Sequence, residues 1–166
     1  MHQPAHFIQQ YQLVPHPEGG WYKETYKSKD LIPMEGLPAS FSGPRVFSTA
    51  IYFLLEKGNF SAFHTIKSDE CWHFYAGGAL DIFILSEGKE LKHIQLGNDV
   101  AKGQLFQYCV PANTWFASRP AVGTEFSFVG CTVAPGFDFD DFQLADKSQL
   151  TNLFPSQASL IAELCR

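Results

Sequence analysis

The sequence has little charge and no cluster of basic residues. Asp, Glu, Lys and Arg together make up 17% of the 166 residues, and the formal net charge is −5. No two of the 12 Lys and Arg residues are adjacent. Proteins that bind nucleic acids or anionic membranes normally present a basic face. The composition therefore argues against a nucleic-acid polymer and against a membrane as partners.

Long apolar runs and targeting signals are also absent from the sequence. The first residues, MHQPAHFIQQYQL, contain neither the basic segment nor the apolar segment of a signal peptide. No apolar stretch approaches the length needed to span a bilayer. We therefore expect a cytoplasmic protein.

The four cysteines form no Cys-x-x-Cys pair. Cys71, Cys109, Cys131 and Cys165 are far apart, and their neighbours are mostly apolar, as in QYCVP and VGCTV. Such surroundings suit buried free thiols better than zinc ligands or a disulfide scaffold. We expect four reduced, buried cysteines.

Aromatic residues and short β-prone runs, in contrast, are abundant. Aromatics make up 15% of the chain, with 16 Phe, and 45% of the residues are hydrophobic. Short apolar runs separated by turn residues are typical of a β-sandwich or β-barrel. We expect strands near residues 46–55, 60–66, 71–76, 80–86, 91–96, 105–110, 115–118 and 125–133.

The length and this pattern predict one all-β domain over residues 1–166. Helical spacing of apolar residues predicts an N-terminal helix at 4–13, followed by a barrel at 14–135. Residues 136–166 are expected to form a C-terminal helical tail. The Gly- and Pro-containing segment 28–44 is a candidate lid or subunit-contact arm.

One stretch carries a recognisable pattern of chemistry-bearing residues. In GNFSAFHTIKSDECWHFYAG, Gly58, His64, Glu70 and Gly77 have the spacing of the first cupin motif, which they resemble. The second histidine of that motif is replaced by Ile66.

A weaker match to the second cupin motif follows. Gly103, Pro111 and Asn113 resemble its first part, and Phe116 stands where the motif has a histidine ligand. Asn113 stands where related chains tend to have glycine, so the turn needs a residue that tolerates positive φ, as Asn does.

Five further segments narrow the resemblance to the small cupin family that carries an HPEGG segment and is largely of unassigned function. These segments are HPEGGWYKETYKS, STAIYFLLEKG, HTIKSDECWHFYAGG, VPANTWFAS and APGFDFDDFQLAD. The resemblance implies a double-stranded β-helix, that is, an RmlC-like jelly-roll barrel with an open mouth and short terminal helices. It also implies a homodimer.

The cupin alignment leaves too few metal ligands. His64 and Glu70 remain, whereas a divalent metal in an open barrel needs three or four convergent ligands. His73 is a candidate third ligand, but strand alternation points it away from the face that carries Glu70. We therefore expect no cofactor. A divalent transition metal on His64, Glu70 and His73 stays open as an alternative.

The remaining pair could act without a metal. A carboxylate beside a histidine raises its basicity, so His64 with Glu70 is a candidate general base. Tyr22 and Tyr52 are the candidate acids. The alternative is that His64 and Glu70 simply satisfy each other inside the barrel as the relic of a lost metal site.

Substrate contacts are expected around this pair. Glu18 precedes two glycines and could bond sugar hydroxyls or cap the turn, and Lys67 is a candidate anion contact at the mouth. Five aromatic residues are candidate pocket walls, with plain core as the alternative. These are Tyr52, Trp72, Phe74, Trp115 and Phe116.

Three functions therefore stay open. The first is a metal-independent, epimerase- or isomerase-like enzyme acting on a sugar or sugar nucleotide, in which a histidine removes a proton next to a carbonyl and a tyrosine returns one. The second is a non-catalytic metabolite-binding or sensor protein. The third is a metal-dependent cupin that uses His64 and Glu70.

Overall fold

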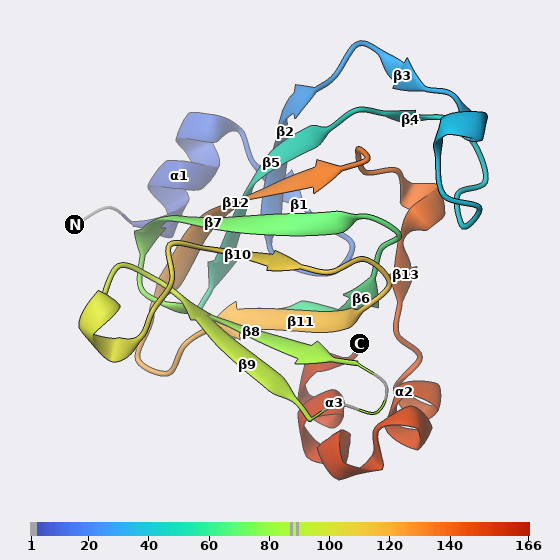
Figure 1. The fold of residues 1–166 in the computed structure, drawn as a ribbon. Helices are drawn as coiled ribbons and strands as arrows, with labels where there is room; N and C mark the ends of the chain where they lie inside the picture. Colours follow the sequence, from blue (N-terminus) through green and yellow to red (C-terminus); the bar gives the residue numbers. More distant parts are fainter. Residues whose placement is uncertain (1–2, 87, 89) are drawn as a thin grey trace.

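The computed structural model describes residues 3–86, 88 and 90–166, which form two facing antiparallel sheets with helices at both ends of the chain (Figure 1). The predicted all-β barrel with short terminal helices is confirmed. The large sheet has the strand order β1-β2-β5-β12-β7-β10, and the small sheet has the order β13-β6-β11-β8-β9.

The bounds of the strands follow the order of the sheets. In the large sheet they are β1 (Val14–Pro15), β2 (Trp21–Lys27), β5 (Thr49–Glu56), β12 (Phe126–Ala134), β7 (Asp69–Gly77) and β10 (Gln107–Val110). In the small sheet they are β13 (Gln143–Leu144), β6 (Ser61–Thr65), β11 (Trp115–Pro120), β8 (Leu80–Leu85) and β9 (Lys92–Leu96). The expected central strands are all present, with ends that differ by a few residues.

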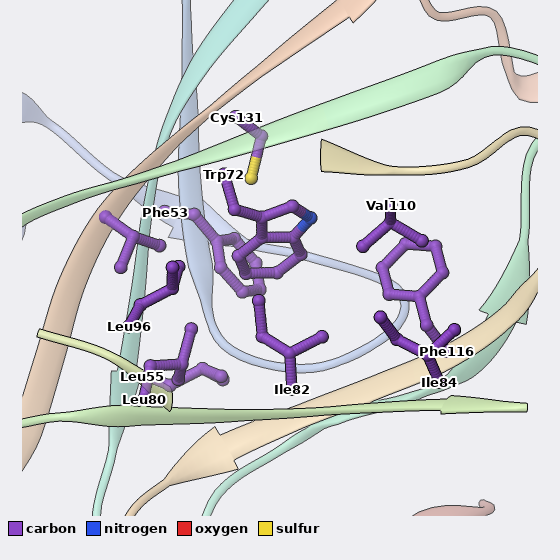
Figure 2. Close-up of a cluster of buried hydrophobic side chains, with 11 residues drawn as sticks. Phe53, Leu55, Trp72, Leu80, Ile82, Ile84, Leu96, Val110, Phe116 and Cys131 are labelled. Atoms are coloured by element: carbon purple, nitrogen blue, oxygen red, sulfur yellow. The ribbon is translucent and has the colours of Figure 1, made fainter. Parts of the chain in front are cut away.

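Alternate side chains of both sheets meet between them (Figure 2). Phe53 and Trp72 enter from the large sheet and Phe116 from the small sheet, and all three are buried. The Trp72 ring meets the Phe53 and Phe116 rings edge-on, with centroids 5.7 and 6.1 Å apart. This packing fills part of the barrel interior with aromatic side chains.

The helices cover part of the outer face of each sheet. Helix α1 (Pro4–Tyr11) lays Phe7 on Phe128 of the large sheet, with ring centroids 4.6 Å apart. Helices α2 (Lys147–Leu153) and α3 (Ala158–Leu164) pack on the small sheet. Because the small sheet is covered on both faces, every residue of β8 is buried. No helix in the described part of the chain is long and apolar enough to cross a membrane.

Three details differ from expectation. Helix α1 ends at Tyr11 rather than at residue 13, because Gln12 adopts a left-handed conformation with φ of 52°. The segment 28–44, the candidate lid or subunit-contact arm, contains β3 (Leu31–Ile32) and η1 (Met34–Gly36) and leads into β4 (Arg45–Val46). The C-terminal tail contains η3 (Phe139–Asp141) and strand β13 as well as helices. The expected positive φ of Asn113 is observed, at 57°.

Candidate functional site

A cavity of about 240 Å³ lies inside the barrel next to the inner face of the large sheet. Its walls come from the segment before β2, from β2, β5, β6, β7 and β12, and from the segment after β12. The lining residues are His16, Glu18, Tyr22, Glu24, Thr49, Ile51, His64, Ile66, Glu70, Cys131, Val133, Phe137, Phe139 and Phe142. Phe139 is 53% exposed and marks the opening to solvent. The lining contains three carboxylates and two imidazoles but neither Lys nor Arg.

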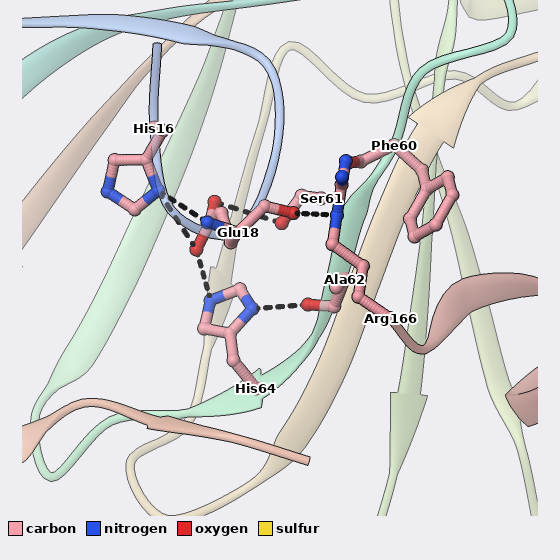
Figure 3. A network of polar contacts seen from close by, with 7 residues as sticks. All are labelled: His16, Glu18, Phe60, Ser61, Ala62, His64 and Arg166. Atoms are coloured by element: carbon pink, nitrogen blue, oxygen red, sulfur yellow. Dashed lines mark hydrogen bonds and ion pairs between the residues drawn. The ribbon is translucent and has the colours of Figure 1, made fainter. Parts of the chain in front are cut away.

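The HPEGG turn (residues 16–20) brings two of these side chains into the cavity. Gly19 and Gly20 have φ values of 114° and 76°, which side chains with a Cβ rarely adopt. A Cβ on Gly19 would lie 2.1 Å from the Phe60 carbonyl oxygen. The turn can therefore pack against the neighbouring strand only with glycine, and this close packing points His16 and Glu18 inward (Figure 3).

His64 forms a close pair with Glu18 of the HPEGG turn. Its Nε2 lies 3.2 Å from Glu18 Oε2, and its Nδ1 lies 2.7 Å from the Ala62 carbonyl oxygen (Figure 3). A carbonyl only accepts, so Nδ1 carries a proton and donates. The contact between Nε2 and Oε2 then holds one shared proton, on either the imidazole or the carboxyl group. Ser61 donates its hydroxyl to Glu18 Oε1 at 2.9 Å.

This pairing corrects the predicted dyad. The sequence suggested a hydrogen bond between His64 and Glu70, but among the described residues the carboxylate partner of His64 is Glu18. Burial lowers the pKa of His64, and the charge of Glu70 opposes this effect. The reason for the pairing with Glu18 is that the HPEGG turn, distant in sequence, packs beside β6 and occupies the Nε2 side of the ring.

His16 occupies the other side of Glu18. The Glu18 N–H donates to His16 Nδ1 at 3.3 Å, so the neutral ring carries its proton on Nε2. Burial lowers the pKa of His16, although the charge of Glu18 opposes this effect. His16 is therefore a neutral hydrogen-bonding group of the cavity wall at neutral pH.

Burial also shifts the pKa values of four further groups of the cavity, Glu18, His64, Glu70 and Cys131, toward their neutral forms. It raises the pKa of Glu70 to about 7 against the opposing charge of His64, and Glu18 raises it further. Burial likewise raises the pKa of Glu18 and lowers that of His64. The Cys131 thiol beside Glu70 has a pKa well above its ordinary value, chiefly because of burial. Glu70, with a pKa of about 7, can therefore exchange a proton near neutral pH.

A strap formed by residues 137–142 closes one side of the cavity. Its Asp141 accepts two hydrogen bonds from Arg45, from Nε at 2.6 Å and from Nη2 at 2.7 Å. Lys67 Nζ lies 3.2 Å from the same carboxylate. Burial opposes ionisation of Asp141, but the bonds from Arg45 and Lys67 outweigh it and lower its pKa. Lys67, predicted as an anion contact, is instead committed to Asp141 and does not line the cavity.

The structure places the predicted tyrosines on opposite faces of the large sheet. Tyr22 lines the cavity, and its ring meets His16 edge-on with centroids 4.6 Å apart. Tyr52 points outward, where its ring lies 4.8 Å from that of Tyr11 in α1. Tyr52 is therefore too remote to act as an acid in the cavity, because its neighbour Phe53 takes the inward position in β5.

The predicted aromatic walls prove to be core. Trp72, Phe74 and Phe116 belong to the packed interior, and Phe116 lies behind His64 with ring centroids 4.1 Å apart. Trp115 packs on the outer face of the small sheet against the C-terminal helices. The aromatic walls are instead Tyr22 and the three phenylalanines of the strap. Sequence reasoning missed these phenylalanines together with His16, Glu24 and Cys131. The phenylalanine repeat in FDFDDF was the available signal for the strap.

The residues present do not fit the metal site of a cupin barrel. Across residues 3–86, 88 and 90–166, no three His, Cys, Asp or Glu side chains are placed to hold a metal ion. Both nitrogens of His64 face protein oxygens, and Ile66 lines the cavity where a second histidine would stand. His73 lies on the outer face, with Nε2 3.2 Å from Thr132 Oγ1, as strand alternation predicted.

Comparison with known proteins gives the family. The family model described as Cupin superfamily (DUF985) matches residues 5–145. The chain belongs to this family. It is 30% identical over 168 residues to the Saccharomyces cerevisiae protein named Uncharacterized protein YML079W, covering 95% of this chain and 83% of that one.

Two solved structures are similar over nearly the whole chain. Protein SO0799 from Shewanella oneidensis has a TM-score of 0.88 at 37% identity, covering 100% of this chain and 99% of that chain. A hypothetical protein from Leishmania major has a TM-score of 0.88 at 32% identity, covering 99% of each chain. The family match confirms the predicted membership of the cupin superfamily.

Proposed function

We propose that this cupin binds a small, uncharged, hydroxylated metabolite such as a sugar and transfers a proton on it without a metal ion. One observation carries the proposal: the buried pair of His64 and Glu18, with Glu70 and Tyr22, lines a single cavity. The predicted reaction is of the epimerase or isomerase type.

The chemistry of the cavity supports an uncharged ligand. Its carboxylates and imidazoles can donate and accept hydrogen bonds to hydroxyl groups, and its phenylalanines can pack on the apolar faces of a sugar ring. A sugar nucleotide, the other substrate expected from the sequence, fits less well. Its phosphates would face carboxylates and find no Lys or Arg in the lining.

The proposed step is removal of a proton from carbon next to a carbonyl group. Glu18 occupies His64 Nε2 in the ligand-free protein, so His64 can accept this proton once the bound substrate displaces Glu18 from that nitrogen. Tyr22, which also lines the cavity, can return a proton through its hydroxyl. Glu70, with a pKa of about 7, is available as a second proton acceptor.

The test is hydrogen exchange in deuterated buffer with a panel of small aldoses and ketoses. Wild-type protein should introduce deuterium next to the carbonyl of at least one compound, and His64→Gln should lose about 100-fold or more of this rate. Tyr22→Phe should also lose activity. His93→Gln, on the outside of the small sheet with its partner Asp81, is the matched control and should keep the rate.

Other outcomes separate the alternatives. Saturable binding of a sugar with no exchange in any compound would contradict catalysis and favour a metabolite sensor. In a sensor, the contacts of Glu18 with His64 and Ser61 would have a structural role only. Elemental analysis of dialysed, tag-free protein should find no stoichiometric transition metal. One metal per chain that disappears in His64→Ala would contradict the metal-independent reaction.

A further inference from the structure

Two cysteines that are far apart in sequence lie directly opposite each other in the large sheet. Cys71 of β7 and Cys109 of β10 are register partners in an antiparallel ladder. The prediction of four buried cysteines is therefore wrong, since Cys109 is exposed, Cys71 is half-buried and only Cys131 is fully buried. Neither Cys71 nor Cys109 lines the cavity.

The position of the pair in the ladder favours a covalent bond. The Phe74 N–H donates to the Phe106 carbonyl at 2.7 Å, which identifies this as a hydrogen-bonded pair. In an antiparallel ladder, hydrogen-bonded and non-hydrogen-bonded pairs alternate from one residue pair to the next. The cysteine pair lies three residue pairs beyond the pair of Phe74 and Phe106, so it is a non-hydrogen-bonded pair. In that arrangement the Cα atoms lie about 4.5 Å apart, within the roughly 4.4–6.8 Å that disulfides span.

The side chains also point to the same side. Directly opposite residues of an antiparallel pair project to one face, and Trp72 between Cys71 and His73 occupies the interior. The cysteines therefore share the outer face. Burial raises the pKa of both thiols, and each thiol also affects the pKa of the other, as expected for neighbouring groups.

We propose that Cys71 and Cys109 are a redox-responsive pair that a small-molecule disulfide converts into a cross-strand disulfide bond. The thiolate of exposed Cys109 attacks one sulfur of the oxidant RSSR, forms a mixed disulfide and releases one RSH. The thiolate of Cys71 then attacks Cys109 Sγ, forms the protein disulfide and releases the second RSH. The oxidant takes up the two electrons, and the two thiol protons leave with the two RSH molecules.

The bond would fasten the edge of the large sheet beside the candidate site. Strand β10 ends the strand order of the large sheet, where its neighbour is β7. The next ladder pair joins Val110 to Glu70, the cavity carboxylate. A crosslink at this position restrains the unfolded chain and holds the edge strand on β7, so the oxidised protein should be the more stable form.

The experiment exposes the reduced full-length chain to oxidised glutathione at mildly alkaline pH, followed by alkylation and mass spectrometry. Wild-type protein should lose two alkylation sites and give a non-reduced peptide that links residues 71 and 109. Dithiothreitol should reverse both changes. Cys165→Ser, which removes a half-buried cysteine far from this ladder in sequence, is the matched control and should still form the bond.

A second variant keeps the proposal falsifiable. Cys71→Ser should stop at a glutathione adduct on Cys109, and wild-type protein, unlike Cys71→Ser, should gain several degrees in melting temperature on oxidation. A wild-type chain that keeps the same adduct as Cys71→Ser would overturn the proposal. Complete resistance of Cys109 to glutathione would overturn it as well.

Discussion

At the scale of the residue, the unusual feature of this protein is a carboxyl group that stays protonated to neutral pH. Glu70 is buried beside His64, Glu18 and Cys131, and its pKa is raised to about 7, chiefly by burial. The folded protein therefore holds a proton above pH 4.5, the ordinary pKa, where the unfolded chain has lost it. The contribution of Glu70 to the free energy of unfolding is fully present below pH 4.5. It decreases as the pH rises toward about 7 and is constant above that pH.

Replacement of Glu70 by Gln should remove this pH dependence. The shift in pKa corresponds to a cost on the order of 3 kcal/mol once the group is ionised, so Glu70→Gln should gain stability over wild type as the pH rises above about 5. Urea unfolding across this pH range measures the difference. The exposed Glu35→Gln is the control and should follow the wild-type profile; a constant offset between Glu70→Gln and wild type would contradict the raised pKa.

At the scale of the element, the HPEGG turn shows how backbone geometry positions chemistry. Gly20 has a φ of 76°, and a Cβ there would lie 2.8 Å from the Leu54 carbonyl oxygen and 2.7 Å from Leu55 Cδ2. Gly58, at a φ of 82°, has open space around the same position. The two glycines have similar φ values but differ in packing. Comparing an alanine substitution at each position therefore separates the cost of backbone strain from the cost of steric crowding.

Gly58→Ala should therefore cost only the strain of the left-handed conformation, about 1–2 kcal/mol. Gly20→Ala should cost about 1–3 kcal/mol more because it also pushes the turn away from β5. Denaturant midpoints of the two variants measure this difference. An equal loss of unfolding free energy in the two variants would contradict the inference that close packing against β5 holds the turn, and with it Glu18, in place.

The same element explains which parts of the site could be predicted from sequence. Motif spacing identified His64 and Glu70, and Gly19 with Gly20 drew attention to Glu18. The pairing of Glu18 with His64 could not be predicted, because it joins segments 46 positions apart through tertiary packing alone. Sequence reasoning assigned no cavity role to His16, since nothing local shows that the turn faces inward.

The strands were easier to predict than the faces of the strands. Turn residues delimit each apolar run, so the positions of the central strands followed from sequence. In β5, however, both faces are apolar, because the core covers Phe53 and α1 covers Leu54 and Tyr52. The alternation of apolar and polar residues then does not show which face is inside, so the sequence predicts Tyr52 in the cavity although its side chain points outward. β8 has the same property, since C-terminal helices cover its outer face.

At the scale of the whole molecule, exposed apolar side chains gather near an open sheet edge. Among the residues that the structure describes, β1 pairs with β2 only at Tyr22 and Trp21, which leaves the rest of β2 with one unpaired side. Tyr26, Leu31 and Phe47, in and beside this segment, are each more than half exposed. An open edge with apolar neighbours can pair with a second copy of itself across a two-fold axis.

We therefore propose that the homodimer implied by the family resemblance forms at this edge, beside the strand that supplies Tyr22 and Glu24 to the cavity.

Light scattering should give twice the chain mass of 18.6 kDa. The double variant Tyr26→Glu with Phe47→Glu should give the monomer mass while still unfolding cooperatively, because both side chains are exposed in the single chain. Val100→Glu, at an exposed apolar residue of η2 (Val100–Lys102), is the control and should stay dimeric. A monomeric wild-type protein, or a double variant that remains a dimer, would contradict this interface.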